Sequence, residues 1–316
     1  MDLDQTERWT DFLRQLGYRP DTVLGAGMEG TVIGIGDDLV VKIWHRRTTG
    51  ELEVLKSFYD AVARSDASFD APRIFDVLTL DGQCATVETL LSGRPLRNPT
   101  GSDSSSAASP VGDDDVACVT DVLAALAAVE TTADLGALPI LADEPPFRTE
   151  IMPFARSLAA LVQRRVERFR RVLSARLPEL DVVTEAVVRR LNGLELGKTC
   201  LVHGDLIPAN VLVDDATRPL AILDFGFMTT IGDPAFDAAV TASIFDMYGP
   251  RAAETEAILD AAVAARFGYE PGRVAVYRAA YALVTSNCFS ASGSDGHFDW
   301  CMRILECPEV HEALEL

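Results

Sequence analysis

Residues 201–214 of the 316-residue chain read LVHGDLIPANVLVD, and this stretch does most to decide the fold. Asp205 and Asn210 lie five positions apart on a loop between two apolar segments, the D-x-x-x-x-N arrangement. The transition state of phosphoryl transfer is loose, so a protein mainly positions groups and neutralises charge. We therefore expect Asp205 to orient an attacking hydroxyl as the catalytic base and Asn210 to be a Mg²⁺ ligand. His203 is expected to orient this loop rather than to titrate.

A second aspartate follows nineteen residues after Asp205, within LAILDFG at residues 220–226. An aspartate that ends an apolar strand must place its charge against a partner or a metal ion. Asp224 is therefore predicted to link Mg²⁺ to the β- and γ-phosphates of a nucleoside triphosphate.

A glycine-rich segment, GAGMEGTV, occupies residues 25–32. The same spacing also opens dinucleotide-binding folds, but there the third glycine leads into a helix. Here the sequence continues as a strand, so the glycines are expected at the tip of a hairpin whose backbone N–H groups cover phosphates. The predicted nucleotide-binding residues of this segment are Gly25, Gly27, Gly30 and Val32.

Lys42 stands in the apolar strand VVKIW at residues 40–44. A lysine in such a strand usually has a partner, and the functional interpretation is a cation on the α- and β-phosphates. Its partner is expected to be a carboxylate of the helix at residues 49–64, with Glu53 preferred and Glu51 as the alternative.

The order of elements predicts an α+β chain of two lobes. Residues 1–91 are expected to form a small lobe of antiparallel sheet plus one helix, and residues 92–316 a larger, mostly helical lobe. The sheet is predicted from strands within residues 22–44, 73–79 and 83–91, and the helices fall at residues 49–64, 116–131, 153–177, 182–191 and within 237–316. Residues 97–115 are rich in Ser, Gly, Pro and Asp and are predicted to be a flexible insert.

Composition excludes several other classes of protein. A net charge of −20 and a pI near 4.5 disfavour nucleic acid as a partner. No apolar stretch approaches the ~20 residues that cross a bilayer, and no secretory signal is apparent, so no membrane association is expected. The six cysteines include no C-x-x-C pair and predict reduced thiols in the cytoplasm.

Two details narrow the pattern to a family. The loop reads His203-Gly204-Asp205, and residues 231–237 read IGDPAFD. With the other motifs, these resemble the aminoglycoside phosphotransferase family of the protein-kinase-like superfamily, which also has choline and homoserine kinase relatives. The resemblance implies a bilobal protein-kinase-like fold, an ATP or GTP cofactor with Mg²⁺, Asp205 as base, and Asn210 and Asp224 as metal ligands.

The resemblance also assigns residues outside the catalytic loop. It implies that Asp237 holds the catalytic loop from below. It further implies that residues 88–93 are a hinge in which the Glu88 carbonyl and the Leu90 N–H bind adenine. Only six residues separate Gly226 from Asp233, which leaves no segment on which a peptide substrate could dock.

The acceptor is therefore expected to be a small hydroxylated molecule, and an aminoglycoside-like compound is the first hypothesis. Acidic residues of the final stretch could bind a cationic acceptor or could simply be solvated: Asp295, Asp299, Glu306, Glu309, Glu312 and Glu315. The competing interpretation is a catalytically silent regulator that binds nucleotide. Either a monomer or a dimer fits the sequence.

Overall fold

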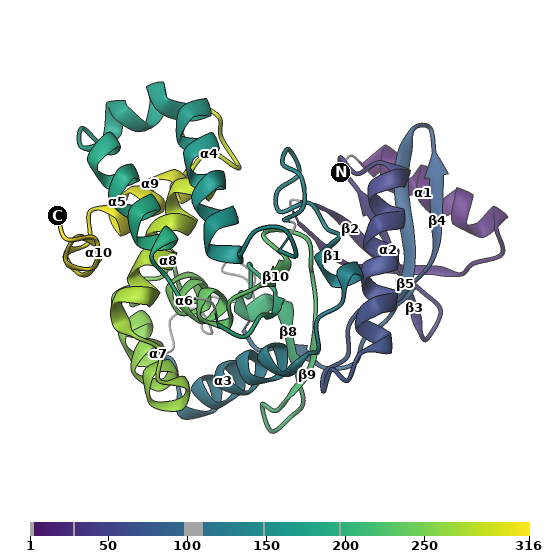
Figure 1. Cartoon of the computed structure of the whole chain (residues 1–316). Helices are drawn as coiled ribbons and strands as arrows, with labels where there is room; N and C mark the ends of the chain where they lie inside the picture. The colour runs from purple at the N-terminus through teal and green to yellow at the C-terminus, as the bar shows by residue number, and fades with distance from the viewer. Residues whose placement is uncertain (1–2, 28, 98–109, 148, 196) are drawn as a thin grey trace.

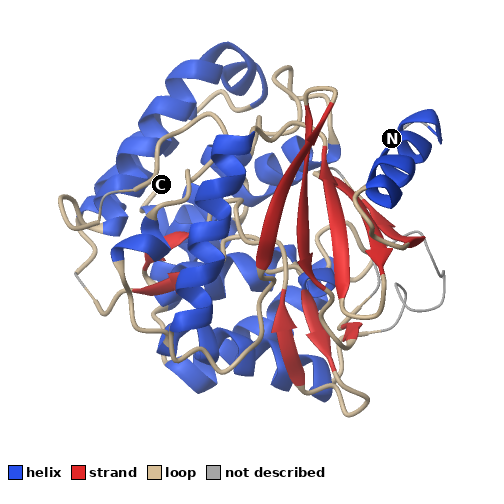
Figure 2. Cartoon of the chain, turned by 90° about the vertical axis from the view of Figure 1, so that its right-hand side faces the viewer, coloured by secondary structure: helices blue, strands red, loops and turns tan. Residues whose placement is uncertain are grey.

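The computed structural model describes residues 3–27, 29–97, 110–147, 149–195 and 197–316. It has the expected α+β architecture, with an antiparallel sheet and its helices on one side and a larger helical part on the other (Figures 1 and 2). Most of the predicted insert, residues 98–109, lies outside the described residues. Among the described helices, none is long and apolar enough to cross a membrane.

The sheet has five strands in the order β1-β2-β3-β5-β4, and every neighbouring pair is antiparallel. In β3, Lys42 lies opposite Val32 of β2 and Thr86 of β5, while Val40 lies opposite Glu88. Since side chains alternate between the faces of a sheet, Val40, Lys42, Thr86 and Glu88 share one face. The strands are β1 (Pro20–Ala26), β2 (Gly30–Ile35), β3 (Leu39–Trp44), β4 (Ile74–Leu80) and β5 (Gln83–Thr89).

Two helices accompany this sheet. The predicted helix, α2 (Thr49–Arg64), begins with a capping box between Thr48 and Glu51. An additional helix, α1 (Leu3–Gln15), precedes the sheet. It buries Trp9 and Leu13 in a cluster with residues of β2, β3 and β5, and it covers the outer face of the sheet (Figure 2). The helical spacing of Trp9, Phe12 and Leu13 in a largely polar segment is a sequence signal for α1.

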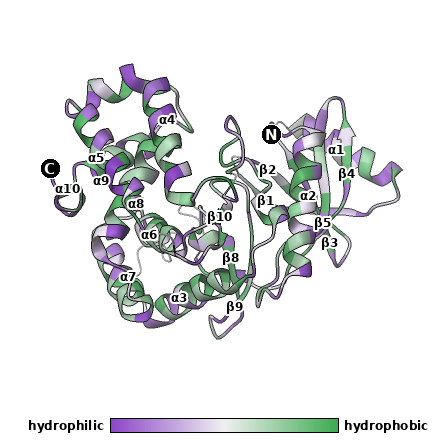
Figure 3. Ribbon diagram, viewed as in Figure 1, coloured by the Kyte–Doolittle hydropathy of each residue, from purple (hydrophilic) through white to green (hydrophobic). Residues whose placement is uncertain are grey.

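The larger part is mostly helical, as expected. Helix α3 begins at Asp113 rather than at residue 116, because three successive aspartates stabilise the positive end of the helix dipole. Hydrophilic residues gather on the outer turns of α4 and α5 (Figure 3). The helices are α3 (Asp113–Ala128), α4 (Phe154–Arg176), α5 (Leu180–Asn192), α6 (Pro234–Ile244), α7 (Ala252–Phe267), α8 (Pro271–Thr285), α9 (Gly296–Leu305) and α10 (Pro308–Leu314).

Short strands in this part shape the loops that face the first sheet. Strand β7 (Cys200–Val202) pairs with β10 (Thr230–Gly232), and β8 (Val211–Val213) lies between β6 (Arg94–Pro95) and β9 (Pro219–Ile222). The loop of residues 203–210 connects β7 to β8, and residues 223–229 connect β9 to β10. The two predicted chemical motifs therefore lie on adjacent loops held by two small sheets.

Candidate active site

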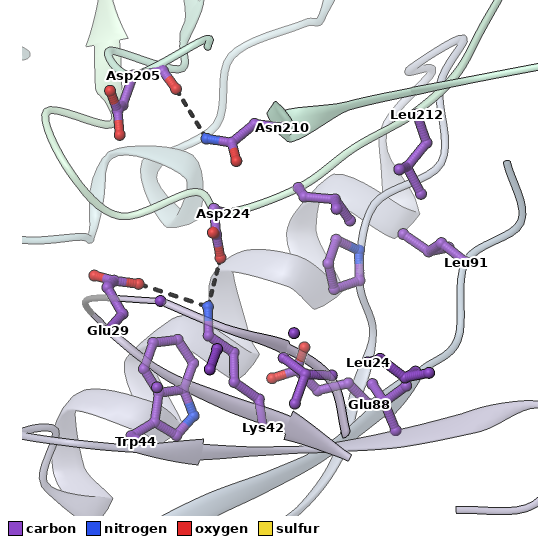
Figure 4. A pocket seen from close by; sticks show the side chains of 18 of the residues that line it. Leu24, Glu29, Lys42, Trp44, Glu88, Leu91, Asp205, Asn210, Leu212 and Asp224 are labelled. Carbon is purple, nitrogen blue, oxygen red and sulfur yellow. Dashed lines mark hydrogen bonds and ion pairs between the residues drawn. The ribbon is translucent and has the colours of Figure 1, made fainter. Parts of the chain in front are cut away.

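A pocket of about 480 Å³ lies between the five-stranded sheet and the loops of the helical part. Figure 4 shows Lys42 reaching toward Asp224, with Asp205 and Asn210 beyond it. The pocket collects nearly all of the residues predicted from the sequence: Gly25, Gly27, Gly30, Val32, Lys42, Glu88, Leu90, Asp205, Asn210 and Asp224. Glu53 is the predicted site residue that does not line it.

The loop of residues 203–210 is held in place by Asp237. Its carboxylate accepts the backbone N–H groups of His203 and Gly204, each at 2.7 Å. The His203 ring is fully buried, its Nδ1 accepts the Asp205 N–H at 3.2 Å, and its Nε2 lies 2.8 Å from the Leu223 carbonyl, to which it donates. Burial lowers the pKa of His203 to about 4. His203 is therefore a neutral group that ties the two loops together.

Gly204 lets these loops approach closely. Its φ is +82°, and an added Cβ would lie 2.5 Å from the Cβ of Met228 on the neighbouring loop. A side chain here would meet both the left-handed backbone and a clash. This accounts structurally for glycine between His203 and Asp205.

Asp205 lies in surroundings that disfavour its negative charge. Burial, with the nearby carboxylates of Asp224 and Glu29, raises the pKa of Asp205 to about 7. The Asn210 side-chain nitrogen donates to the Asp205 backbone carbonyl at 3.0 Å, which fixes the amide orientation. The amide oxygen of Asn210 is thereby left available for a ligand.

Lys42 and Asp224 connect the two parts of the molecule. The Lys42 ammonium donates to the Asp224 carboxylate, lies 3.6 Å from the Glu29 carboxylate, and sits 4.0 Å from the centre of the Trp44 ring. Burial alone would lower the pKa of Lys42, but Asp224, Glu29 and Glu88 outweigh it and raise that pKa. Burial would likewise raise the pKa of Asp224, but Lys42 lowers it. Both groups are therefore charged.

The oxygen atoms of Asn210 and Asp224 fit a hard cation. Within the described residues no group of three His, Cys, Asp or Glu side chains could hold a metal ion. Mg²⁺ commonly uses only one or two protein ligands and completes its shell with phosphates and water. One carboxylate and one amide oxygen suit that mode and do not suit zinc.

The prediction that Glu53 pairs with Lys42 is wrong. Glu53 is exposed on α2 and makes no ion pair within the described part of the chain. The Glu51 carboxylate accepts hydrogen bonds from the backbone N–H and the hydroxyl of the N-cap residue, Thr48. The buried stripe of α2 includes Leu52, Leu55 and Tyr59, and it turns Glu53 toward solvent. Tyr59 is the α2 residue that lines the pocket.

Glu29 at the hairpin tip is a contact that the sequence pattern did not suggest. Besides Lys42, its carboxylate contacts Arg47 at 3.1 Å. The hairpin itself matches the prediction: the Gly27 N–H donates to the Gly30 carbonyl at 2.9 Å, and Gly30 begins β2. A Cβ on Gly30 would lie 2.3 Å from the Ile43 carbonyl oxygen. Because a strand follows, the dinucleotide alternative is excluded.

The hinge also differs from the expectation. The Leu90 N–H donates to the Asp38 carbonyl at 2.8 Å and is not free to bind a base. In an antiparallel ladder every second opposed pair is hydrogen-bonded. Because Leu90 and Asp38 form such a pair, Glu88 and Val40, two residues further along, form the next one, and the Glu88 carbonyl is also engaged. The N–H of Leu91, which lines the pocket, donates to no described residue. The register places the open backbone donor one residue later than predicted.

The outer end of the pocket is aromatic. Phe227 and Phe289 both line it, and their rings are stacked with centroids 6.0 Å apart. Several acidic residues of the last stretch are engaged elsewhere: Glu306 with Arg176, Glu315 with Arg189 and Arg190, and Asp295 as the N-cap of α9. They do not form one continuous acidic wall beside Asp205.

Comparison with known proteins agrees with this geometry. No curated protein matches the sequence. Among solved structures, the fold is similar to the ADP-bound aminoglycoside phosphotransferase APH(2'')-Ib, with a TM-score of 0.59, 12% identity and 99% of each chain covered. It is also similar to macrolide 2'-phosphotransferase MphH from Brachybacterium faecium, with a TM-score of 0.56, 21% identity, and 96% of this chain and 99% of that chain covered.

A third similar structure is aminoglycoside phosphotransferase APH(3'')-Id from Streptomyces rimosus in complex with ADP and streptomycin. Its TM-score is 0.52 at 17% identity, with 90% of this chain and 99% of that chain covered. At such low sequence identities, the structural similarity shows a shared fold and nothing about activity. The sequence of residues 22–277 matches the phosphotransferase enzyme family. Since that match spans most of the chain and the phosphoryl-transfer motifs meet in one pocket, the chain belongs to the phosphotransferase enzyme family.

Proposed function

We propose that this protein is a magnesium-dependent kinase that transfers the γ-phosphate of ATP or GTP to a hydroxyl group of a small molecule. The observation that carries the proposal is the ion pair between Lys42 of β3 and Asp224 after β9, in a pocket that Asp205 and Asn210 also line. The residues proposed as phosphate-binding cation, hydroxyl-orienting carboxylate and metal ligands all line this one pocket.

In the proposed reaction the chain mainly orients and neutralises. Lys42 and the backbone N–H groups of the glycine hairpin would hold the phosphates, while Asn210 and Asp224 would hold Mg²⁺. Bound Mg²⁺ would neutralise charge on the β- and γ-phosphate oxygens. The Asp205 carboxylate would accept the hydroxyl proton as the bond from oxygen to the γ-phosphorus forms and the bond to the β-phosphate oxygen breaks. A pKa of about 7 suits a base that works near neutral pH.

The acceptor is proposed to be an aminoglycoside-like or other hydroxylated small molecule. Similar structures hold streptomycin and kanamycin, and another is a macrolide 2'-phosphotransferase. In this chain the stacked rings of Phe227 and Phe289 offer an apolar surface at the end of the pocket. An acceptor with an apolar face beside its hydroxyl would bury that face there. Antibiotic resistance or phosphorylation of a metabolite in the cytoplasm would both use this chemistry.

A transfer assay tests the proposal. The purified protein, Mg²⁺ and γ-labelled ATP or GTP are incubated with aminoglycosides, macrolides, choline, homoserine and nucleosides, and labelled products are separated. We expect one class of hydroxylated acceptor to become labelled, and the Asp205→Asn variant to label it far more slowly. Tight nucleotide binding with no labelled product from any compound would instead support the silent regulator.

A further inference from the structure

Glu88 is an acidic side chain on the sheet side of the pocket. The residue is 6% exposed, and it lines the pocket from β5. It shares the pocket-facing side of the sheet with Val40 and Lys42, because Val40 lies opposite Glu88 in the ladder. Figure 4 shows the Glu88 carboxylate between the Lys42 side chain and Leu24.

One oxygen of Glu88 is anchored and the other is not. The Thr86 hydroxyl donates to Oε1, and that hydroxyl in turn accepts the Trp44 indole N–H at 2.8 Å. Oε2 accepts no hydrogen bond from the described residues, and the ion pairs of Lys42 are with Asp224 and Glu29 instead. Oε2 is open to the pocket rather than fully enclosed, so it can accept a hydrogen bond from a bound molecule. Its position in the pocket lining therefore indicates a ligand that brings a donor to Oε2.

The position of Glu88 indicates which part of a nucleotide brings that donor. Lys42 and Asp224 mark the phosphate end of the pocket, whereas Leu24, Val32 and Leu212 supply apolar surfaces that suit a flat base. Figure 4 shows Glu88 next to Leu24, one of these apolar residues. The base is the part of a nucleotide that would lie against these residues.

Adenine and guanine carry different groups at position 6 of the purine ring. The 6-amino group of adenine donates hydrogen bonds, whereas guanine has a carbonyl oxygen at the same position. We propose that Glu88 Oε2 accepts a hydrogen bond from the 6-amino group of adenine and thereby selects ATP over GTP. This inference rests on the proposed function, because it requires that the pocket holds a nucleoside triphosphate.

Glu88 could act on Lys42 instead, since the two side chains share one face of the sheet. The two roles make different predictions. A carboxylate that only stabilises the Lys42 ammonium affects the phosphates, which ATP and GTP have in common. Removal of such a carboxylate would lower the affinities for ATP and GTP equally. Removal of a carboxylate that contacts the base would change the ratio of the two affinities.

Calorimetric titration of the full chain with ADP, GDP and inosine diphosphate tests the proposal without an acceptor. We expect the unmodified protein to bind ADP ~10-fold or more tightly than GDP or inosine diphosphate, because both competitors place a carbonyl oxygen opposite the carboxylate. In Glu88→Gln the side-chain amide can donate to that oxygen, so the preference for ADP should fall by ~10-fold. Glu53→Gln, the same change at an exposed position of the same lobe, should leave all three affinities unchanged.

Equal binding of ADP and GDP by the unmodified protein would overturn the inference while leaving the proposed kinase intact. An equal loss of both nucleotides in Glu88→Gln, with native circular dichroism, would also overturn it and assign Glu88 to Lys42. If the unmodified protein binds none of the nucleotides, the proposed function fails together with the inference.

Discussion

The surroundings of Asp205 have opposite effects on catalysis and on the stability of the fold. The burial and the neighbouring carboxylates that raise its pKa to about 7 also make its charge unfavourable for folding. An ordinary aspartate titrates near ~3.9, and a shift of one pKa unit is worth ~1.4 kcal/mol. The surroundings that suit Asp205 for accepting a proton near neutral pH therefore reduce the stability of the folded state.

Replacing Asp205 by Asn should lower turnover by ~10² to 10⁴, the range for loss of a positioned base. The amide keeps the shape of the side chain but cannot take the hydroxyl proton, so nucleotide affinity should change little. Nucleotide hydrolysis or transfer measured as ADP release, together with ADP titration, separates the two quantities. Asp215→Asn changes an exposed carboxylate close in sequence and serves as the control. Full activity of Asp205→Asn would contradict the assigned role.

The same variant should be more stable than the unmodified protein at pH 8 when EDTA removes metal ions. In the folded state the pKa of Asp205 is about 7, above its unfolded value, so its contribution to stability is lost as pH rises from about 4 through 7. Asn has no such loss. Urea unfolding should show a gain of at least ~1 kcal/mol for Asp205→Asn at pH 8 and almost none at pH 4. A gain that does not depend on pH would argue against a desolvated carboxylate.

At the scale of elements, two neighbouring loops hold the chemistry. The loop after β7 carries Asp205 and the loop after β9 carries Asp224. The His203 ring joins them through its hydrogen bond to the Leu223 carbonyl, and Asp237 of α6 holds the first loop by accepting the backbone N–H groups of His203 and Gly204. The separation of the two loops is set at Gly204, which faces Met228. The precision of the site thus depends on backbone contacts rather than on the acidic side chains themselves.

Gly204→Ala should destabilise the protein by ~2 kcal/mol or more, because it adds a Cβ at positive φ and forces Met228 away. Activity should fall as well, since Asp205 and Asp224 would move apart. The matched substitution Gly50→Ala lies in α2, where no atom is within 4 Å of an added Cβ. It should be neutral or stabilising by ~0.4–1 kcal/mol. Thermal unfolding of both variants, with activity at a temperature where both are folded, provides the measurement.

At the scale of the molecule, charged side chains connect the sheet to the helical part, and a bound nucleotide would contact the same side chains. The ion pair between Lys42 and Asp224 spans this boundary, and Glu29 adds a second carboxylate from the hairpin. With 48 acidic and 28 basic residues, the chain as a whole has an excess of negative charge. Bound Mg²⁺ would offset the negative charge of Asp224, and a nucleotide that binds only the folded state would stabilise the whole fold.

Mg²⁺ with ADP at 100 times its dissociation constant should therefore raise the free energy of unfolding by ~2.7 kcal/mol. In Asp224→Ala the part of this gain that depends on Mg²⁺ should disappear, because the variant lacks the carboxylate ligand. Differential scanning calorimetry with ADP alone and with ADP plus Mg²⁺ measures the two parts. A gain in Asp224→Ala equal to that of the unmodified protein would show that Asp224 holds no metal.

The sequence by itself determined the fold class and the chemical groups of the site. Asp205, Asn210, Asp224 and the glycine hairpin were predicted because each stands in a short motif whose spacing is set along the backbone. The helix at residues 49–64 was predicted with its bounds, since a regular apolar stripe is a local signal, and the structure adds a capping box at its start.

Only the tertiary structure decided which side chains meet. Glu53 was predicted as the partner of Lys42, but the rotation of α2 on the sheet presents Tyr59 to the pocket and leaves Glu29 and Asp224 to pair with the lysine. The register of β5 against β3 likewise engaged the Leu90 N–H and turned the Glu88 side chain inward. Helix rotation and strand register depend on packing between segments distant in sequence, so no local pattern specifies them.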